Sequence, residues 1–352
     1  MTIEPYNVVG LIPAIWGIRS RNEIAKNLEH LHELMSLGVN MSNMDLPTRL
    51  VAIPEGALQG FTDEVEDMDH VEYARNFAID IPGKETDTLA QWARDFNVYI
   101  MAQAKARHSD FPDRFFNVGF VIDPEGEIIL RHYKITPLYP LERSISPHDV
   151  FDLWVDRYGK TLDAFWPVVD TPIGRLGVMM ANEASYPENA RALALNGCEI
   201  AYRTSFPLPG TCNEMFEIQN RARALDNNMY VLAPNAGAYY PSVTATVPVD
   251  PFGGRSMIVN YRGQVLSHVP HGGTPTAITA TIDIAALRHH RLHSPWTNWA
   301  KDLRTELYQI VYADTIYPKN LYLNQAPFKH AAYRENVTKA QIHLMQKRGT
   351  WK

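Results

Sequence analysis

The sequence predicts an α/β fold in which helices cover mostly buried sheets. Strand-like apolar runs alternate with helix-like segments as far as about residue 283, and such alternation is typical of layered α/β proteins. The hydrophobic fraction of 45% is ample for a large core. No Gly/Ser-rich or charged linker divides this stretch, so we expect one domain over residues 1–285. Residues 286–352 are irregular, aromatic and rich in His and Arg. We expect them to form an extension that wraps a neighbouring subunit or the chain's own body.

The first half of the chain has the elements of one sheet with its helices. Apolar runs predict strands at 7–15, 49–53, 98–104, 117–122 and 127–133, and apolar spacing predicts helices at 22–37 and 86–96. The sequence Pro-Glu-Gly occurs after the second strand, at 54–56, and again at 124–126. Both are turn signals, and the second joins its two strands into a hairpin.

The second half repeats this rhythm in pattern only. Strands are predicted at 177–180, 199–202, 229–233, 255–260 and 265–269, and helices at 187–195 and 214–226. The last two strands are joined by a short turn at 261–264 and read as a second hairpin.

Composition and charge exclude several classes of protein. Lys and Arg number 33 against 39 Asp and Glu, and the net charge of −6 makes a nucleic-acid partner improbable on electrostatic grounds. No apolar run approaches the roughly 18–20 residues of a membrane-spanning helix, and the N-terminus lacks the basic region of a signal peptide. Only two cysteines occur, Cys198 and Cys212, which excludes a disulfide framework. We therefore expect a cytoplasmic protein that contacts no membrane.

Polar side chains follow three of the predicted strands. Glu55 follows the strand at 49–53, Lys134 follows the strand at 127–133, and the segment Ala181-Asn182-Glu183-Ala184-Ser185-Tyr186-Pro187-Glu188 follows the strand at 177–180. Strand ends are a common location for active-site groups in α/β proteins. A single charge at such a place is more often a solvated loop residue, but three in this order indicate a site.

With these segments the sequence resembles the nitrilase superfamily of carbon–nitrogen hydrolases, whose members share a Glu-Lys-Cys triad on a four-layer α-β-β-α sandwich. Pro-Glu-Gly at 54–56 matches the glutamate motif, Tyr133-Lys134 with Pro137 matches the lysine motif, and residues 181–188 match the cysteine motif. One element departs from the pattern, because Ala181 stands where the family has its nucleophilic cysteine. The resemblance covers about residues 7–285, and the YKITPLYPLE stretch with the long tail looks most like the aliphatic amidase and formamidase branch.

The resemblance implies a role for each matched residue. Glu55 would be the general base, and Lys134 with the backbone amide of Asn182 would stabilise the oxyanion. Glu142 falls where the family has a second glutamate that orients the lysine and the substrate. Position 181 would carry the thiol that forms a thioester and releases ammonia, which water then hydrolyses. No metal, nucleotide or other cofactor is needed for these steps.

Ala181 cannot form a thioester, and two explanations for it stay open. One is an engineered Cys→Ala replacement that keeps substrate intact, and the other is a natural pseudoenzyme. Retention of Glu55, Lys134, Glu142 and the flanking motif favours the first, and we hypothesise that the parent protein has Cys at 181. Neither Cys198, expected in the core, nor Cys212, expected to pack at a helix start, has motif context for a replacement nucleophile.

Position in the sequence suggests further substrate contacts. Besides Asn182, we expect Glu183 and Tyr186 near the substrate, and Arg203 and Ser205 after the next strand, with Tyr202 and Phe206 as pocket neighbours. Arg203 would bind a substrate carboxylate or form a structural ion pair.

Two other stretches bear on binding. The aromatic stretch at 147–167 would be a lid over a bulky substrate or, somewhat more in keeping with large aromatics, packing material. The histidines at 289, 290 and 293 lie among arginines with no carboxylate at useful spacing, so we reject a metal site.

We therefore expect an amidase-type hydrolase acting on a small-molecule amide or nitrile, assembled as a homodimer or a larger homo-oligomer. A nitrilase or an N-carbamoyl amide hydrolase is the runner-up, and a non-catalytic binding or scaffolding protein is the alternative from another class. The sequence does not specify the exact substrate, the number of subunits or the pathway.

Overall fold

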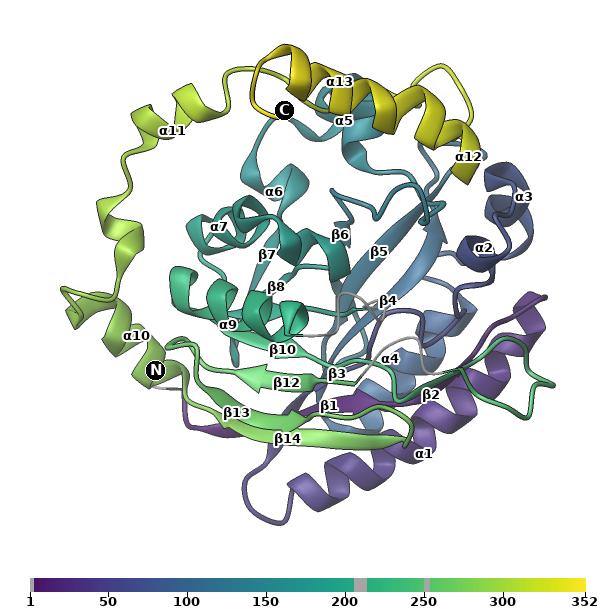
Figure 1. Cartoon of the computed structure of the whole chain (residues 1–352). Coiled ribbons are helices and arrows are strands. Elements are labelled where there is room, and N and C mark those ends of the chain that lie inside the picture. Colours follow the sequence, from purple (N-terminus) through teal and green to yellow (C-terminus); the bar gives the residue numbers. More distant parts are fainter. Residues whose placement is uncertain (1–2, 206–213, 250–253) are drawn as a thin grey trace.

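The computed structural model describes residues 3–205, 214–249 and 254–352. Two six-stranded sheets form its centre (Figure 1). The first sheet has the order β14 (Thr276–Ile282), β1 (Tyr6–Ile12), β3 (Thr48–Ala52), β4 (Tyr99–Arg107), β5 (Phe115–Ile122) and β6 (Ile128–Tyr133). The second has the order β13 (Val265–Val269), β12 (Ser256–Val259), β10 (Tyr230–Ala233), β9 (Ile200–Tyr202), β8 (Gly174–Val178) and β7 (Val168–Thr171). A short parallel pair, β2 (Ala14–Trp16) with β11 (Ala238–Tyr240), lies outside both sheets.

The two sheets have the same topology, which explains why the second half of the sequence repeats the strand and helix pattern of the first half. In each, three strands run parallel: β1, β3 and β4 in the first sheet, and β8, β9 and β10 in the second. An antiparallel strand flanks the first member of each trio, and an antiparallel hairpin follows the last. Because the carboxyl ends of parallel strands lie at one edge of a sheet, each sheet presents its strand-end loops together.

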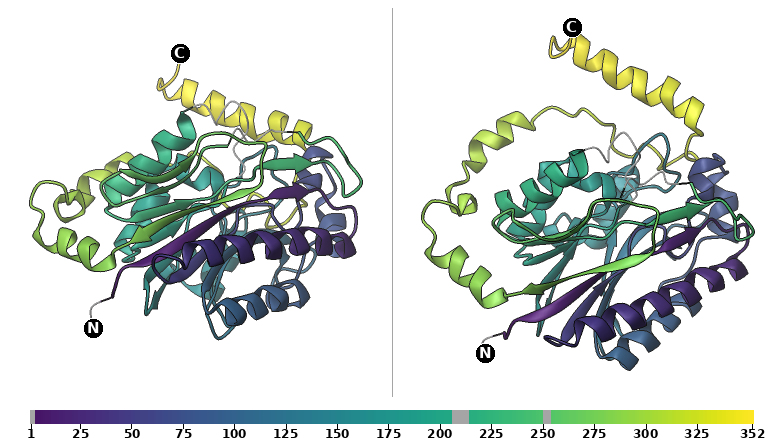
Figure 2. Two further views of the ribbon diagram at one scale, coloured as in Figure 1. Left: turned by 90° about the horizontal axis from the view of Figure 1, so that it is seen from below. Right: turned by 60° about the horizontal axis from the view of Figure 1, so that its bottom comes forward.

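Alternating side chains of the strands fill three separate layers of core. Residues such as Val8, Leu50, Met101, Val178 and Tyr202 form the core between the two sheets. The opposite face of the first sheet is covered by α1 (Ile24–Ser42) and α4 (Lys84–Phe96), and that of the second by α7 (Pro187–Leu195) and α9 (Met215–Asn227). The order helix, sheet, sheet, helix is visible in Figure 2, so the predicted four-layer α-β-β-α sandwich is confirmed.

The sheets approach each other closely where β5 crosses β8. A Cβ atom built on Gly119 would lie 2.5 Å from Cγ1 of Val178, so glycine is required by the spacing. This contact lies beside the strand ends that carry the polar segments of the sequence analysis.

Smaller helices surround the first sheet at its polar end. They are α2 (Thr62–Val65), α3 (His70–Asn76), α5 (Phe151–Tyr158) and α6 (Leu162–Phe165). Trp154 and Phe165 are buried in the outer core of the first sheet. The packing interpretation of the aromatic stretch at 147–167 is thereby favoured over a lid.

The C-terminal extension is more helical than the sequence analysis expected. It contains α10 (Ile284–His293), α11 (Thr305–Val311), α12 (His330–Tyr333) and α13 (Lys339–Lys347), so the expectation of an irregular stretch after about residue 283 was wrong. Figure 1 shows this extension leaving β14, passing along one side of the body, and ending with α13 across it. Tyr322, Tyr333 and Val337 enter the outer core of the first sheet of their own chain. That the extension also wraps a neighbouring subunit stays a prediction.

Over the residues that the structure describes, none of the helices combines the length and the apolar character needed to cross a bilayer.

Candidate active site

Two buried carboxylates and one buried ammonium group meet at the polar end of the first sheet. Nζ of Lys134, directly after β6, lies 3.1 Å from Oε1 of Glu55 and 2.7 Å from Oε2 of Glu142. Glu55 comes from the turn after β3, and Glu142 from the loop after Lys134. The exposed fractions are 3%, 1% and 3% for Glu55, Lys134 and Glu142. An ammonium group has three donors, and within the described residues two acceptors contact Nζ, so the third N–H is available for another acceptor.

Asn117 of β5 donates hydrogen bonds to both carboxylates. Its Nδ2 donates to Oε1 of Glu55 and to Oε1 of Glu142, each at 2.8 Å. Its own Oδ1 accepts from Nε2 of Gln103 at 2.6 Å, and Oε1 of Gln103 accepts from the backbone amide of Gly56 at 2.8 Å. The orientation of the Asn117 amide is thus fixed by its partners. The fully buried side chain of Asn117 links the turn that contains Glu55 to the loop that contains Glu142.

Opposite charges and hydrogen bonds outweigh burial in setting the pKa values of Lys134 and Glu142. Burial alone would lower the pKa of Lys134, but the carboxylates of Glu142 and Glu55 outweigh burial and raise it above its ordinary value. Burial would raise the pKa of Glu142, but Lys134, Asn117 and the amide of Leu138 together lower it. At neutral pH Lys134 is therefore a fixed cation facing carboxylate partners.

Position 181 lies in a strained turn after β8. Ala181 has a φ of +38°, a backbone conformation that residues with a side chain rarely adopt. The strain is held by hydrogen bonds, since its amide donates to the carbonyl of Thr204 at 2.6 Å and the amide of Met180 donates to Oε2 of Glu183 at 2.6 Å. Strained positions of this kind concentrate at functional sites, where the surrounding structure imposes them.

Glu183 connects the turn at Ala181 to the segment around Lys134. Its Oε1 accepts from the backbone amide of Ile135 at 2.7 Å, and its carboxylate lies 2.9 Å from Nε2 of His132. Glu183 is fully buried. His132 and Ile135, close to Lys134, and the amide of Met180, just before Ala181, therefore all contact one carboxylate. Since protein groups occupy both oxygens of Glu183, its contacts support a positioning role.

The end of β9 connects position 181 to the segment that contains Glu55. The hydroxyl of Tyr202 donates to the carbonyl of Ile53, just before Glu55. The guanidinium of Arg203 contacts Asn220 at 2.7 Å, Gln219 at 2.8 Å and the carbonyl of Ala181 at 3.3 Å. Burial and the nearby Arg223 lower the pKa of Arg203 to about 9, which leaves it charged at neutral pH. Its donors thus support the turn and the adjacent α9.

Asn182 and Tyr186 line a cavity of about 460 Å³ beside the turn. Asn182 donates to the carbonyl of Thr136 at 3.3 Å, and Tyr186 is 47% exposed. The other walls come from the loop after Lys134 and from the C-terminal extension, and include Pro137, Leu138, Tyr139, Tyr317 and Tyr333. Ser205 is buried and forms an isolated bridge with Asn235. Phe206 lies outside the described residues.

Cys198 adds no nucleophile to this arrangement. Cys198 is buried in the core of the second sheet, and burial raises the pKa of its thiol to about 12. Cys212 lies outside the described residues. Among those that are described, no group of three His, Cys, Asp or Glu side chains could hold a metal ion.

Three positioning residues were missed in the sequence analysis: Asn117, Gln103 and His132. Each is a polar side chain inside or at the end of an apolar strand, and all three are buried. A buried polar group requires partners, so the polar residues in these three strands were the available signal.

Comparison with known proteins agrees with this architecture. The model of the carbon–nitrogen hydrolase family matches residues 14–291. A formamidase of Helicobacter acinonychis (strain Sheeba) is 29% identical over 239 residues, which are 67% of this chain and 64% of that protein. A formamidase of Bacillus cereus (strain AH820) is 27% identical over 224 residues, or 63% of this chain and 59% of that protein. The chain thus aligns with less than two thirds of the length of these curated relatives.

Solved structures share the fold. Nit3 of Saccharomyces cerevisiae, a member of branch 10 of the nitrilase superfamily, superposes with a TM-score of 0.63 at 19% identity, over 84% of this chain and 96% of that one. An amidase of Nesterenkonia sp. has a TM-score of 0.63 at 16% identity, over 87% of this chain and 96% of that one. The matched family model covers most of the sequence, and the fold is the four-layer sandwich expected for it. The chain belongs to the carbon–nitrogen hydrolase family.

Proposed function

We propose that this protein is a hydrolase of linear amides whose reaction centre lies between Glu55, Lys134 and position 181, and that with Ala181 it binds substrate without turning it over. The observation that carries the proposal is the left-handed turn at Ala181, which is connected by hydrogen bonds both to the segment that flanks Lys134 and, through β9, to the strand that precedes Glu55. Formamidase relatives and the amidase fold support the reaction class.

With a cysteine at position 181 the side chains have complementary roles. Glu55 takes the thiol proton, and the thiolate attacks the amide carbonyl carbon to form a C–S bond. The third N–H of Lys134 and the backbone amide of Asn182 stabilise the negative oxygen of the tetrahedral intermediate. Glu55 then gives its proton to the leaving nitrogen, the C–N bond breaks and ammonia departs.

Water completes the cycle. Glu55 takes a proton from the water that attacks the thioester, and the acid leaves as the proton returns to sulfur. Glu142 keeps Lys134 oriented throughout, because its Oε2 accepts from Nζ at 2.7 Å. The methyl group of Ala181 forms no C–S bond, so the chain binds the amide and stops before the first covalent step.

The cavity beside the turn suggests where the rest of the substrate lies. Its walls include Asn182, next to Ala181 in the sequence, and Leu138 and Tyr139 from the loop after Lys134, whereas Glu55, Lys134 and Ala181 do not line it. Apolar and aromatic walls favour a primary amide with an apolar substituent. A nitrile yields the same acid and one ammonia as the corresponding amide, so the two are distinguished by assaying each pure compound separately. An N-carbamoyl compound is distinguished by its products, since it yields an amine and carbon dioxide with the ammonia.

The experiment that tests the proposal is A181C, assayed for ammonia release from a panel that runs from formamide to benzamide. We expect turnover by A181C, none by the Ala181 chain, and none by A181C combined with K134M. Calorimetry on the Ala181 chain should find that the amides hydrolysed by A181C bind and are recovered intact. A folded A181C that releases no ammonia from any amide, nitrile or N-carbamoyl compound contradicts the proposal and favours the non-catalytic alternative.

Assembly and location complete the proposal. The exposed apolar side chains of Leu195 on α7 and of Met215 and Ile218 on α9 support a homodimer or larger homo-oligomer through these helices, which light scattering on the purified protein tests. Only two cysteines in 352 residues support a cytoplasmic location, which fractionation of the source cells tests.

A further inference from the structure

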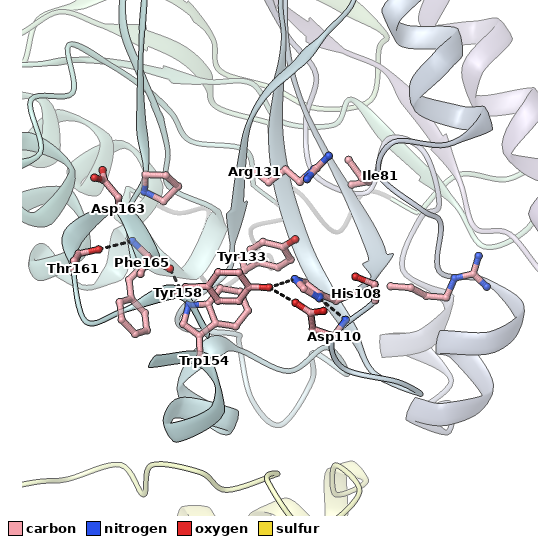
Figure 3. A pocket seen from close by; sticks show the side chains of 14 residues that line it. Ile81, His108, Asp110, Arg131, Tyr133, Trp154, Tyr158, Thr161, Asp163 and Phe165 are labelled. Carbon is pink, nitrogen blue, oxygen red and sulfur yellow. Dashed lines mark hydrogen bonds between the residues drawn. The ribbon is translucent and has the colours of Figure 1, made fainter. Parts of the chain in front are cut away.

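A second cavity, of about 510 Å³, is lined by Arg131 and Tyr133 of β6 and by Trp154 and Tyr158 of α5 (Figure 3). Successive residues of a strand point to opposite faces. His132 and Lys134 contact Glu183, Glu55 and Glu142, whereas Arg131 and Tyr133 line this cavity. The cavity is therefore separate from the site described above, and its volume is within the range of about 300–1,000 Å³ typical of small-molecule sites.

One wall of the cavity is a rigid aromatic surface. The ring centroid of Trp154 lies 5.0 Å from that of Tyr133 and 4.6 Å from that of Tyr158. His108 locks Tyr158 in place, since its Nε2 lies 3.1 Å from the tyrosine oxygen, which donates in turn to Oδ2 of Asp110 at 2.7 Å. Burial lowers the pKa of His108, and Arg131 and Arg157 lower it further against the effect of Asp110. His108 is thus neutral near pH 7, and this wall is preorganised.

Among the described residues, the charges around the cavity leave one cation without a partner. Arg157 is paired with Asp110 at 2.6 Å, and Nε of Arg107 is paired with Asp80 at 3.0 Å. Asp163, on the other side of the cavity, accepts from Asn196 at 2.7 Å.

Arg131 differs from these residues. Its side chain is exposed at the cavity, and among the described residues it has neither a hydrogen bond nor an ion pair. Tyr133 lies two residues further along the same strand, and its ring is half-buried in the cavity wall.

We infer that this cavity is a binding site for a small aromatic carboxylate. The ring of the ligand packs against Tyr133 and Tyr158, which the buried Trp154 supports, and its carboxylate pairs with the guanidinium of Arg131. Stacked or edge-on aromatic contacts favour a planar ring, and the planar fork of an arginine matches a carboxylate with two parallel hydrogen bonds. The inference does not depend on the proposed hydrolase activity, because none of these residues contacts Glu55, Lys134 or Ala181.

Calorimetric titration of the Ala181 chain with benzoate tests the inference at low ionic strength. We expect saturable binding of benzoate, at least tenfold weaker binding of acetate, which lacks the ring, and at least tenfold weaker binding of benzyl alcohol, which lacks the charge. The variant R131Q should bind benzoate at least tenfold more weakly.

The matched control is R49Q, because Arg49 is also an exposed arginine of the first sheet without a hydrogen bond or ion pair in the described part of the chain. R49Q should bind benzoate as tightly as the unchanged Ala181 chain does, and both variants should have the melting temperature of the Ala181 chain. Absence of benzoate binding, equal affinity in R131Q and the parent, or equal losses in R131Q and R49Q would each overturn the inference.

Discussion

Replacing Asn117 with leucine tests whether the two carboxylates of the site depend on one buried amide. Leucine is close to asparagine in size, so N117L removes hydrogen bonds without opening a large cavity. Asn117 donates to Glu55 and to Glu142 at 2.8 Å each, with 0% of its surface exposed. A hydrogen bond to a charged group contributes about 1.5–3 kcal/mol, so N117L should lower the free energy of unfolding by about 3–6 kcal/mol at pH 7.

The pH dependence of this loss is the discriminating observation. Asn117 helps to hold the pKa of Glu142 below its ordinary value. A group whose pKa is lowered by folding contributes stability above its unfolded pKa of about 4.5, and that contribution disappears as the pH falls through the folded pKa. N117L removes one of the hydrogen bonds that lower the pKa of Glu142 in the folded protein. The difference in unfolding free energy between the parent and N117L should therefore shrink as the pH falls from 7 to below 4.5.

N27L is the matched control. Asn27 is also buried and makes hydrogen bonds at 2.9 Å, but its partners are the neutral backbone groups of Trp16 and Leu58. Its three neutral hydrogen bonds predict a loss of about 3 kcal/mol that does not change with pH. Urea unfolding of the three proteins at pH 7 and pH 4 measures both quantities. A loss in N117L that is independent of pH, like that in N27L, would refute the role of Asn117 in setting the charge of the site.

Three further predictions concern the frame around the site. Burial lowers the pKa of His70 to about 3, so between pH 6.5 and 3 a proton binds only the unfolded chain and stability falls by about 1.4 kcal/mol per unit as the pH drops. H70Q should remove that share of the slope in urea unfolding, and an unchanged slope would contradict a neutral buried histidine. G119A should lower the unfolding free energy by about 1–3 kcal/mol through overpacking against Val178, and a variant as stable as the parent would show that the sheets are not in close contact there. Removal of residues 317–352 takes away the buried Tyr333 and the hydroxyl of Tyr317, which lies 3.3 Å from Asp149. The melting temperature should therefore fall by several degrees. An unchanged melting temperature would mean that the extension does not stabilise the body of its own chain.

Much of the framework could be predicted from the sequence because the signals are local. The helix at 187–195 and the strand at 265–269 have the predicted bounds, since a proline opens the first and a short turn precedes the second. Glu55, Lys134 and Ala181 each follow a strand in a recognisable motif. A strand end is a local feature, and the fold then brings these ends to the same region.

Other features depend on contacts between distant segments, which no local pattern records. β14 was not predicted, because Thr276–Ile282 alternates Thr and Ala with few large apolar residues, and its pairing with β1 provides what its own side chains lack. The helices of the extension were missed for a related reason: α11 packs no residue into the core of its own chain, and its apolar side chains Leu307, Ile310 and Val311 are exposed. The role of Asn117 was missed because its two carboxylate partners are 62 and 25 residues away.

In the proposed mechanism, position 181 is the place where a nucleophile attacks the amide. Intact-protein mass spectrometry of A181C, quenched in acid during turnover of a slowly hydrolysed amide, tests this most directly. We expect a mass increase equal to the acyl group, located by peptide mapping on residue 181 and absent from the Ala181 chain. An A181C protein that releases ammonia without any acyl adduct, or that carries the adduct on Cys198, would contradict the proposed mechanism.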